Sequence, residues 1–401
     1  MTVHIAIITG QPMANLLPLL VEKPSKLILL VSEDMKTNAE DHAATIQRHP
    51  LLTDLPVELK YGLPETPIAA IQDFGLAILA ELDEQHSDFV FNLAGGTKLM
   101  TLALSQVFAD KQGKQIYPHT RFNKIEILWP EQQAAIELPG VIDAKAYLQT
   151  HGVTWRKAIS DEEHWRHQTE ARKNLTFALA NGLAQAGNTT EKLIGLLNKA
   201  GAQALQGGQL QPQQQLATYS KAFYPLLEQM QQAELIDWDS DDAKTIYFKS
   251  KSALQYLTGA WLEEYYYLVA QQVGLTDSHS SVDFTDDVNR KANIRNELDG
   301  VSAHQNRLLI VECKTAKLGK NEQKDTDMIY KLSSLSKKIG GQFSASLLLS
   351  ALPLDHTTQA GREVKLTERA RGERIEVLAG ADLRKLDKLL LNWMETGRLS
   401  L

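Results

Sequence analysis

The strongest constraint on the fold is a regular alternation within the first 150 residues. Short apolar runs rich in β-branched residues alternate there with longer amphipathic segments of helical period. Such strand–helix alternation predicts an α/β domain with a mostly parallel, doubly wound sheet and helices on both faces. The expected strands are Val3–Thr9, Lys26–Val31, Val57–Tyr61, Asp88–Leu93, Gln115–Tyr117 and Lys124–Trp129. The expected helices lie near Met13–Leu20, Asn38–His49, Pro67–Glu84 and Lys98–Asp110.

Composition narrows the class of protein. The 401 residues are 43% hydrophobic and 23% charged, which excludes a disordered or collagen-like chain. The net charge of −7 argues against a protein coated with positive charge for packaging nucleic acid. The single cysteine, Cys313, excludes an intrachain disulfide and a multi-cysteine zinc site. There is no apolar stretch of membrane-spanning length, and no basic region precedes the first apolar run. We therefore expect a soluble, cytoplasmic protein of two or three domains.

Polar, small residues follow three of the expected strands, where ligands bind in doubly wound sheets. These strand ends are Thr9–Pro12, Ser32–Asp34 and Asn92–Lys98. In the third, Gly95 and Gly96 allow the backbone to approach a ligand closely. Thr97 can cap the following helix, whose free N–H groups would face an anion, and Lys98 adds a positive charge. The segment is neither a Walker loop nor a Gly-x-Gly-x-x-Gly loop, so the residues alone leave two interpretations open: a phosphate or nucleotide site, or a tight capped turn.

The C-terminal third contains a pattern typical of a metal-dependent nuclease. Arg295–Lys314 reads as two strands joined by a turn, with Asp299 on the first strand and Glu312 on the second. Strand alternation places Glu312 and Lys314 on one face and Cys313 on the other. Carboxylate oxygens suit Mg²⁺ or Mn²⁺, and a lysine beside them can steady the nucleophile or the oxyanion. The alternative from the residues alone is a solvated hairpin end with weak ion pairs.

Flanking segments extend this pattern. The helical segment Leu257–Gly274 contains Glu263 and Glu264, whose side chains point about 100° apart, so at most one should face a metal. Downstream, Asn321–Lys338 is expected to be a basic helix. Seven lysines against three acidic residues between Cys313 and Lys338 fit a groove that follows phosphates.

The middle of the chain, residues 151–250, is expected to be a helical connector. The glutamine-rich stretch Gln203–Gln215 reads as an exposed loop. A helix at Ala222–Ala233, followed by strands at Leu235–Trp238 and Thr245–Phe248, has the outline of a winged helix. The turn between these strands is acidic and would repel DNA phosphates, so we expect the connector to have a structural role.

The N-terminal loop resembles a known family. Asn-Leu-Ala-Gly-Gly-Thr-Lys-Leu-Met at 92–100, with Gln11, Pro12 and Asn15 after the first strand, resembles the signature of CARF domains. These are Rossmann-like sensors of the cyclic oligoadenylates made by type III CRISPR systems. The resemblance implies a homodimer with a ring-shaped ligand, cyclic tetra-adenylate, on its two-fold axis. Ala94 departs from the family, which often has threonine there. The ligand-binding residues expected on these grounds are Gly10, Gln11, Asn15, Ser32, Asn92, Gly95, Gly96, Thr97 and Lys98.

The C-terminal third resembles the PD-(D/E)xK endonuclease fold in its Glu-x-Lys motif and in its helix–strand–strand–strand–helix–strand order, with Ser344–Ser350 as the later strand. Together with the helix bearing Gly-x-Trp-Leu-Glu, it is similar to the CARF-linked CRISPR ancillary nucleases over nearly the whole chain. This similarity implies that Glu263, Asp299 and Glu312 bind Mn²⁺ or Mg²⁺ and that Lys314 is the catalytic lysine. Leu298 takes the place of the proline that precedes the first aspartate in the PD-(D/E)xK motif. Two further candidates are Glu297, on the same strand face as Asp299, and Lys331, on the following helix.

We therefore expect three parts: a CARF sensor at 1–150, the connector at 151–250 and a nuclease at 251–401. The expected protein is a metal-dependent endonuclease of type III CRISPR antiviral defence, activated by cyclic tetra-adenylate, with no membrane partner. The sequence leaves open whether the substrate is single-stranded DNA, RNA or supercoiled duplex, and whether the sensor degrades its activator.

The alternative is a nucleotide-sensing, winged-helix transcription regulator with an inactive C-terminal domain. The acidic hairpin and the intact set of Asp299, Glu312 and Lys314 argue against it. An RNase of the HEPN type is excluded because the Arg–His spacing that it needs is absent from the sequence.

Overall fold

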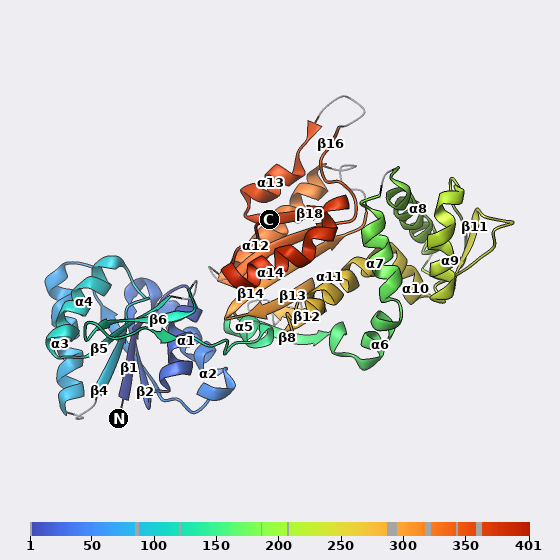
Figure 1. Ribbon diagram of the computed structural model, residues 1–401. Coiled ribbons are helices and arrows are strands. Elements are labelled where there is room, and N and C mark those ends of the chain that lie inside the picture. Colours follow the sequence, from blue (N-terminus) through green and yellow to red (C-terminus); the bar gives the residue numbers. More distant parts are fainter. Residues whose placement is uncertain are drawn as a thin grey trace. The chain divides into compact units, whose positions relative to one another are not determined.

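A computed structural model describes residues 2–84, 88–119, 122–185, 187–206, 208–286, 295–316, 322–341, 344–357 and 363–401 (Figure 1). The chain divides into two compact units. The first contains residues 1–154 with 304–307 and 339–343, and the second contains 155–303, 308–338 and 344–401. Among the helices of the described residues, none is long and apolar enough to cross a membrane.

The first unit is built on a seven-stranded sheet of order β3-β2-β1-β4-β5-β6-β7. The neighbouring strands from β3 to β5 are parallel, which confirms the predicted parallel sheet, whereas β6 and β7 add an antiparallel edge. The strands are β1 Thr2–Ile7, β2 Lys26–Ser32, β3 Val57–Leu63, β4 Asp88–Asn92, β5 Lys114–His119, β6 Lys124–Trp129 and β7 Ile136–Glu137.

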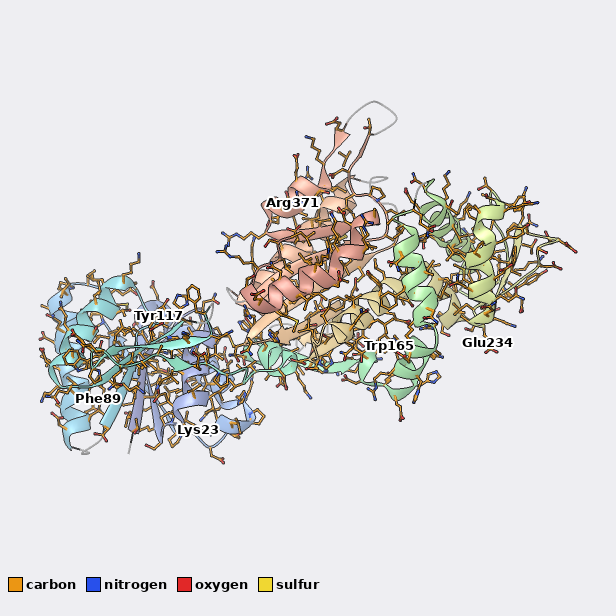
Figure 2. The ribbon with its side chains drawn as sticks, in the orientation of Figure 1. Lys23, Phe89, Tyr117, Trp165, Glu234 and Arg371 are labelled. Atoms are coloured by element: carbon orange, nitrogen blue, oxygen red, sulfur yellow. The ribbon has the colours of Figure 1, made fainter. Side chains whose placement is uncertain are left out.

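Helices cover both faces of this sheet, as predicted (Figure 1). The helices α3 and α4 pack with Val3, Ile5 and Ile7 of β1 in one apolar cluster, and α1 and α2 lie on the other face. Phe89 of β4 contacts Phe108 of α4 edge to face, with ring centroids 5.5 Å apart (Figure 2). The helices are α1 Pro12–Glu22, α2 Ala39–Gln47, α3 Ile68–Glu84, α4 Lys98–Asp110 and α5 Ala144–Thr150.

The strands of the C-terminal third form a six-stranded sheet of order β18-β15-β14-β13-β12-β8, whose edge strand β8 comes from the start of the connector. The strands β12 and β13 are antiparallel, whereas β14, β15 and β18 are parallel to one another. The predicted order of helix, three strands, helix and strand is confirmed by α11, β12, β13, β14, α12 and β15. The strands are β8 Val153–Ala158, β12 Ser278–Asp286, β13 Arg295–His304, β14 Arg307–Lys314, β15 Ser344–Ser350 and β18 Ile375–Ala379. The helices are α11 Trp261–Gln272, α12 Glu322–Gly340, α13 Leu366–Gly372 and α14 Leu386–Thr396.

The part of the chain between β8 and α11 is mainly helical and contains a small sheet of order β10-β11-β9. The predicted hairpin is confirmed, because β10 and β11 pair antiparallel. The prediction of a loop throughout Gln203–Gln215 is wrong at both ends, because α8 continues to Ala204 and β9 pairs with β11. The buried Gln214 side chain donates its Nε2–H to the Gln211 carbonyl at 2.9 Å, which allows a polar residue to face inward. The elements are α6 Glu163–Ala171, α7 Lys173–Gly182, α8 Thr189–Ala204, β9 Gln213–Gln215, α9 Tyr224–Gln232, β10 Ile236–Trp238, β11 Thr245–Phe248, α10 Lys251–Gln255 and a π-helical turn at Tyr256–Ala260.

A fully buried histidine contributes to the pH dependence of the stability of this fold. His4 in β1 is fully buried, and neither ring nitrogen has a hydrogen-bond partner among the described residues. Burial, helped by the charge of Lys114, lowers the pKa of His4 to about 3. In the unfolded chain the pKa is about 6.5, so the unfolded state binds more protons between these values. The contribution to stability is therefore complete above about pH 6.5 and is lost as the pH falls toward 3.

We predict that the thermal midpoint of the full chain falls as the pH is lowered from 6.5 to 4.5. The His4→Leu variant should reduce the slope of the free energy of unfolding against pH by up to about 1.4 kcal/mol per pH unit. Calorimetry across this pH range measures the slope. His167→Gln, at a side chain that is 78% exposed, is the control and should leave the slope unchanged. Equal slopes for the wild type and His4→Leu would contradict the prediction.

Candidate functional site

The carboxylates and the lysine predicted from the C-terminal third are brought together on β13 and β14. The Lys314 Nζ atom lies 2.5 Å from Glu312 Oε1 and 3.6 Å from Asp299 Oδ2. The Cys313 backbone N–H donates to Asp299 Oδ2 at 2.7 Å, which fixes that carboxylate against the neighbouring strand. The Cys313 side chain is buried on the opposite face, as strand alternation predicted. Burial, with the nearby carboxylates, raises the pKa of its thiol, so the cysteine is suited to packing and not to nucleophilic chemistry.

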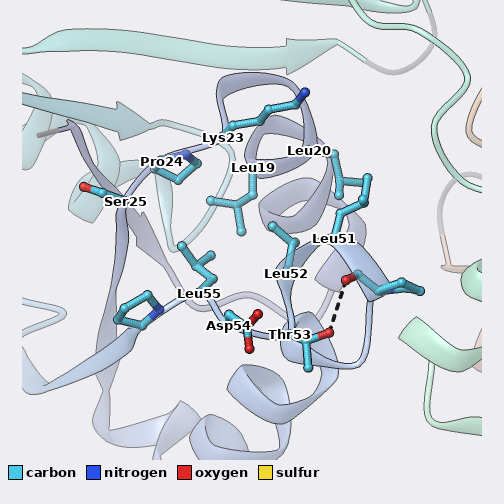
Figure 3. Close-up of a pocket in the computed structure, with 12 residues that line it drawn as sticks. Leu19, Leu20, Lys23, Pro24, Ser25, Leu51, Leu52, Thr53, Asp54 and Leu55 are labelled. Atoms are coloured by element: carbon cyan, nitrogen blue, oxygen red, sulfur yellow. Dashed lines mark hydrogen bonds between the residues drawn. The ribbon is translucent and has the colours of Figure 1, made fainter.

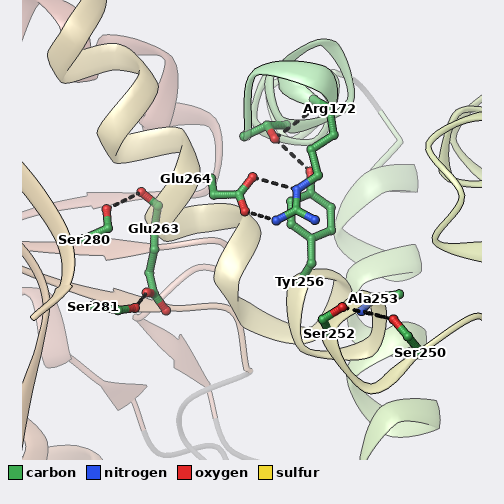
Figure 4. Close-up of polar contacts among 10 residues, drawn as sticks. Arg172, Ser250, Ser252, Ala253, Tyr256, Glu263, Glu264, Ser280 and Ser281 are labelled. Carbon is green, nitrogen blue, oxygen red and sulfur yellow. Dashed lines mark hydrogen bonds and ion pairs between the residues drawn. The ribbon is translucent and has the colours of Figure 1, made fainter. Parts of the chain in front are cut away.

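Glu263 reaches the same cluster from the first turn of α11. Ser281 Oγ of β12 donates to Glu263 Oε2 at 2.6 Å (Figure 4). Burial, followed by the charge of Asp299, raises the pKa of Glu263 to about 8, and the charge of Lys314 acts in the opposite direction. Burial and Asp299 also raise the pKa of Glu297. Five of the residues predicted for the nuclease site therefore interact electrostatically in one place.

The lysine of the cluster stays protonated. Burial alone would lower the pKa of Lys314, but the carboxylates of Glu312 and Asp299 outweigh it and raise that pKa. In this structure the Lys314 ammonium is therefore a positive charge placed beside two carboxylates, where it can act electrostatically. The contacts of Lys314 with Asp299 and Glu312 also account for the present positions of these two carboxylates. Within the described residues, no three carboxylate, imidazole or thiol groups stand together as a metal-binding set.

Ser281 was not predicted to belong to the site. Its φ of +46° is in the left-handed region, which a serine within a strand rarely adopts. It lies between Ser280, which pairs with Gly300, and Val282, which pairs with Leu298, and so stands opposite Asp299. Strained backbone of this kind is concentrated at functional sites. A serine in the sequence carries no sign of its φ, so the structure was needed to find it.

The neighbouring Glu264 points away from the cluster, which agrees with the prediction that only one of the two glutamates faces it. Arg172 donates to both oxygens of Glu264, with its Nε atom at 2.9 Å from Oε2. The Arg172 guanidinium also lies 4.1 Å from the ring centroid of Tyr256 (Figure 4). The ion pair joins the start of α7 to α11. It lies inside the second unit, since the Glu264 side chain is only 1% exposed.

The predicted lysine groove is described only in part. Lys331 is exposed on α12. Its charge acts on the partly buried Glu312 and lowers the pKa of that carboxyl, against the larger effect of burial, which raises it. Lys337 is 3.1 Å from Glu373 and so is already paired. Lys317 and Lys320 lie outside the described residues. The groove remains a prediction.

In the first unit, the Asn92–Lys98 loop is held tightly against the end of β1. A Cβ atom on Gly95 would lie 2.1 Å from the Ile7 carbonyl oxygen, and Gly96 has a φ of +74°. Thr97 caps α4 by accepting the Met100 backbone N–H at 3.3 Å, which confirms the predicted cap. Gly96, Thr97 and Lys98 are exposed, so the loop presents a cationic helix start to solvent.

The buried polar residues near this loop hold the backbone in place. Asn92 Nδ2 donates to the Ala14 carbonyl at 2.9 Å, and its Oδ1 accepts the Ala94 N–H at 3.0 Å. Asn15 Nδ2 donates to the Ile7 carbonyl at 3.0 Å. Both asparagines are fully buried, so in this structure they support the loop from behind. The remaining predicted ligand residues are Ser32, which is buried, Gln11, which is partly exposed, and Gly10, which is exposed.

A separate cavity in the first unit was not predicted. It has a volume of about 420 Å³ and lies between the C-terminal end of α1 and the segments that lead into β2 and β3 (Figure 3). Its lining is largely apolar and includes Leu19, Leu51 and Leu55. Because it borders the residues before β2 and β3, it is at the opposite strand ends from the Gly95 loop.

Two separate parts of the chain match known family models. Residues 3–147 match the family model of the Card1 CARF domain, and residues 250–396 match that of the Card1-like endonuclease domain. None of the curated proteins matches the chain. The fold is similar to that of the protein VC1899 from Vibrio cholerae, with a TM-score of 0.79, 19% identity and coverage of 100% of this chain and 99% of that one. It is also similar to Can2 from Sulfobacillus thermosulfidooxidans, solved in complex with cyclic tetra-adenylate, with a TM-score of 0.74, 22% identity and coverage of 98% and 97%.

The adjacent glutamates of α11 provide a matched pair of variants. We predict that Glu264→Gln lowers the free energy of unfolding by about 3–5 kcal/mol, because it leaves the largely enclosed Arg172, whose side chain is 13% exposed, without its ion pair. Glu263→Gln should change it by less than about 1 kcal/mol at pH 7, because a carboxyl group with a pKa of about 8 is already mostly protonated there. Thermal and urea unfolding compare the two, and equal destabilisation would contradict this assignment.

Proposed function

Because the chain belongs to the Card1 family, with a CARF domain followed by a Card1-like endonuclease domain, we propose that it is a nuclease of type III CRISPR defence that a cyclic oligoadenylate activates. The observation that carries the proposal is that the endonuclease match at 250–396 contains the whole acidic cluster with Lys314. The CARF match at 3–147 likewise contains the exposed cationic loop at Gly96–Lys98.

We propose cyclic tetra-adenylate as the activator, because the similar structure of Can2 contains this ring. The N–H groups at the start of α4 and the Lys98 ammonium are suited to phosphate, and Gly95 and Gly96 allow a ligand to approach the backbone closely. Gly10 and Gln11, at the end of β1, line the same edge of the sheet. A two-fold symmetric ring is matched by two copies of this loop, so the proposal includes a homodimer.

We propose that Glu263, Asp299 and Glu312 bind Mn²⁺ or Mg²⁺. Hard carboxylate oxygens are the ligands that these ions prefer, and the raised pKa values of Glu263 and Glu312 show carboxyl groups that burial keeps from ionising freely. A divalent cation would favour their ionised forms. In the present arrangement of the described residues they do not yet form a three-ligand set, because Lys314 occupies Glu312, so binding of the ion would require Lys314 to move away from that carboxylate. When bound, the ion supplies Lewis acidity and a water molecule of lowered pKa.

The residues of the chain have distinct parts in hydrolysis of a phosphodiester. Glu263 has to release its proton before it can act as a ligand, and Ser281 favours the ionised form by donating to Oε2. Asp299 is oriented by the Cys313 N–H. Lys314, permanently charged, stabilises the additional negative charge on the phosphoryl oxygens as water attacks phosphorus and the P–O bond breaks. DNA and RNA both contain this bond, so a matrix of single-stranded DNA, RNA and supercoiled duplex defines the substrate.

The transcription-regulator alternative has no support in the connector. The hairpin tip between β10 and β11 exposes Asp239, Asp241 and Asp242, and this negative charge is unsuited to DNA phosphates. A regulator would also not require the charged cluster around Lys314.

We predict that cyclic tetra-adenylate and Mn²⁺ together stimulate cleavage by the wild type, and that Glu312→Gln lowers the rate at least about 100-fold. The reason is the loss of one charged ligand and of the partner of Lys314. Initial rates on the substrate matrix, with and without ring and metal, measure the effect. Glu368→Gln, at a side chain that is 70% exposed, is the control. Equal rates for Glu312→Gln and the wild type would exclude this active site.

For the sensor, we predict that Lys98→Ala raises the concentration of cyclic tetra-adenylate needed for half-maximal activation by about 10-fold or more. A charge-assisted hydrogen bond to phosphate contributes on this scale. The unstimulated rate should not change, because Lys98 belongs to the other unit. Lys111→Ala, at the other end of α4 and paired with Asp83 at 3.0 Å, is the matched control. If both variants activate like the wild type, Lys98 does not contact the ring.

A further inference from the structure

Thr315, the residue after the lysine of the site, joins the two pieces from which the site is built. One piece is α11 with Glu263, and the other is the pair of strands with Asp299, Glu312 and Lys314. Thr315 is 6% exposed, and its Oγ1–H donates to the Thr258 carbonyl oxygen at 2.6 Å. This hydrogen bond connects the end of β14 directly to the turn that leads into α11.

That turn is the π-helical segment Tyr256–Ala260, which continues directly into α11. Single π-turns are rare and are frequently found at functional sites, since they change the direction of the residues that follow. Thr258 Oγ1 donates to the carbonyl of Leu254, in the preceding helix α10, at 2.9 Å. Thr258 is therefore bonded on one side to the preceding helix and on the other to Thr315, and Glu263 follows five residues later.

A second contact reaches Thr315 from the connector. Asn198 of α8 donates its Nδ2–H to the Thr315 carbonyl oxygen at 2.8 Å. Helix α8 also packs closely against the π-turn, because a Cβ atom on Gly201 would lie 2.3 Å from Thr258 Cγ2. Both the hydroxyl and the carbonyl of Thr315 are thus held, one by the turn before α11 and the other by α8.

We propose that Thr315 and Asn198 are positioning residues of the nuclease site, which set the position of Glu263 relative to Asp299, Glu312 and Lys314. This inference rests on the proposed nuclease function. It gives the connector a part in catalysis, because Asn198 lies within residues 151–250. A catalytic group displaced by 1 Å costs about 100-fold in rate, whereas one hydrogen bond contributes only a small share of the stability of a domain. Loss of these bonds should therefore affect the rate more than the folding.

The test compares Thr315→Val, which keeps the shape and removes the hydroxyl, with Thr315→Ser, which restores it. The readouts are kcat and the KM for nucleic acid, both with saturating Mn²⁺ and cyclic tetra-adenylate, and the thermal midpoint. We expect Thr315→Val to lower kcat by about 10- to 100-fold with KM unchanged, and Thr315→Ser to recover it. Thr396→Val, which removes a hydroxyl bonded to the Asn392 carbonyl in α14, is the matched control.

Two variants approach the same contact from α8, in case Thr315→Val affects folding. Asn198→Asp removes the N–H donor, and Gly201→Ala forces α8 away from Thr258. Both should lower kcat without changing KM. Wild-type kcat in Thr315→Val or in Asn198→Asp would overturn the inference, as would a Thr315→Ser variant as slow as Thr315→Val. Failure of the proposed function is distinct from these results, because the wild type would then cleave no faster than Glu312→Gln.

Discussion

The crowding of carboxylates in a partly buried site is the constraint on which the second unit depends. Burial and mutual repulsion raise the pKa values of Glu263, Glu297 and Glu312, so the cluster is unfavourable by itself. The fold offsets this with donors fixed from separate elements: the Lys314 ammonium, the Ser281 hydroxyl and the Cys313 N–H. Such fixed donors also make a catalytic site effective, since they need no reorganisation during the reaction.

The donors of the cluster have to be held by separate elements, and the connector and the C-terminal third accordingly form one unit. Their apolar side chains belong to a single core, in which Leu197 of α8 and Trp261 of α11 are both buried. The polar contacts between the two parts include two that reach α11 and the end of β14, the Arg172–Glu264 ion pair and the Asn198–Thr315 hydrogen bond. The apolar packing brings the elements together without directional preference, whereas the two polar contacts are directional and fix the orientation of α11 and the end of β14.

Local sequence patterns predicted the elements that repeat a simple period. The parallel strands of the first unit, the Thr97 cap and the Glu312–Lys314 face all follow from residues close together in the chain. The features that were missed depend on contacts between distant residues. Ser281 has a left-handed φ at the position opposite Asp299. Strand β9 forms by pairing with β11, where Gln214 lies opposite Ile246. For the same reason Asn92 could not be recognised from the sequence as a support for the loop, since its bonds are made to α1.

The rigidity of the sensor loop limits how an activator can act. Gly95 is pressed against the Ile7 carbonyl and Thr97 caps α4, so the proposed binding surface is already formed in this ligand-free structure. A ligand shifts an equilibrium only through a difference in its affinity for two states. A single preformed loop gives the ligand little difference in affinity between two states of one chain. A two-fold ring, however, would contact one loop in a monomer and two loops in the proposed homodimer. In the proposed homodimer, the activator would therefore favour the dimeric state through its second set of contacts, and a loop that needs no ordering on binding would add to this gain.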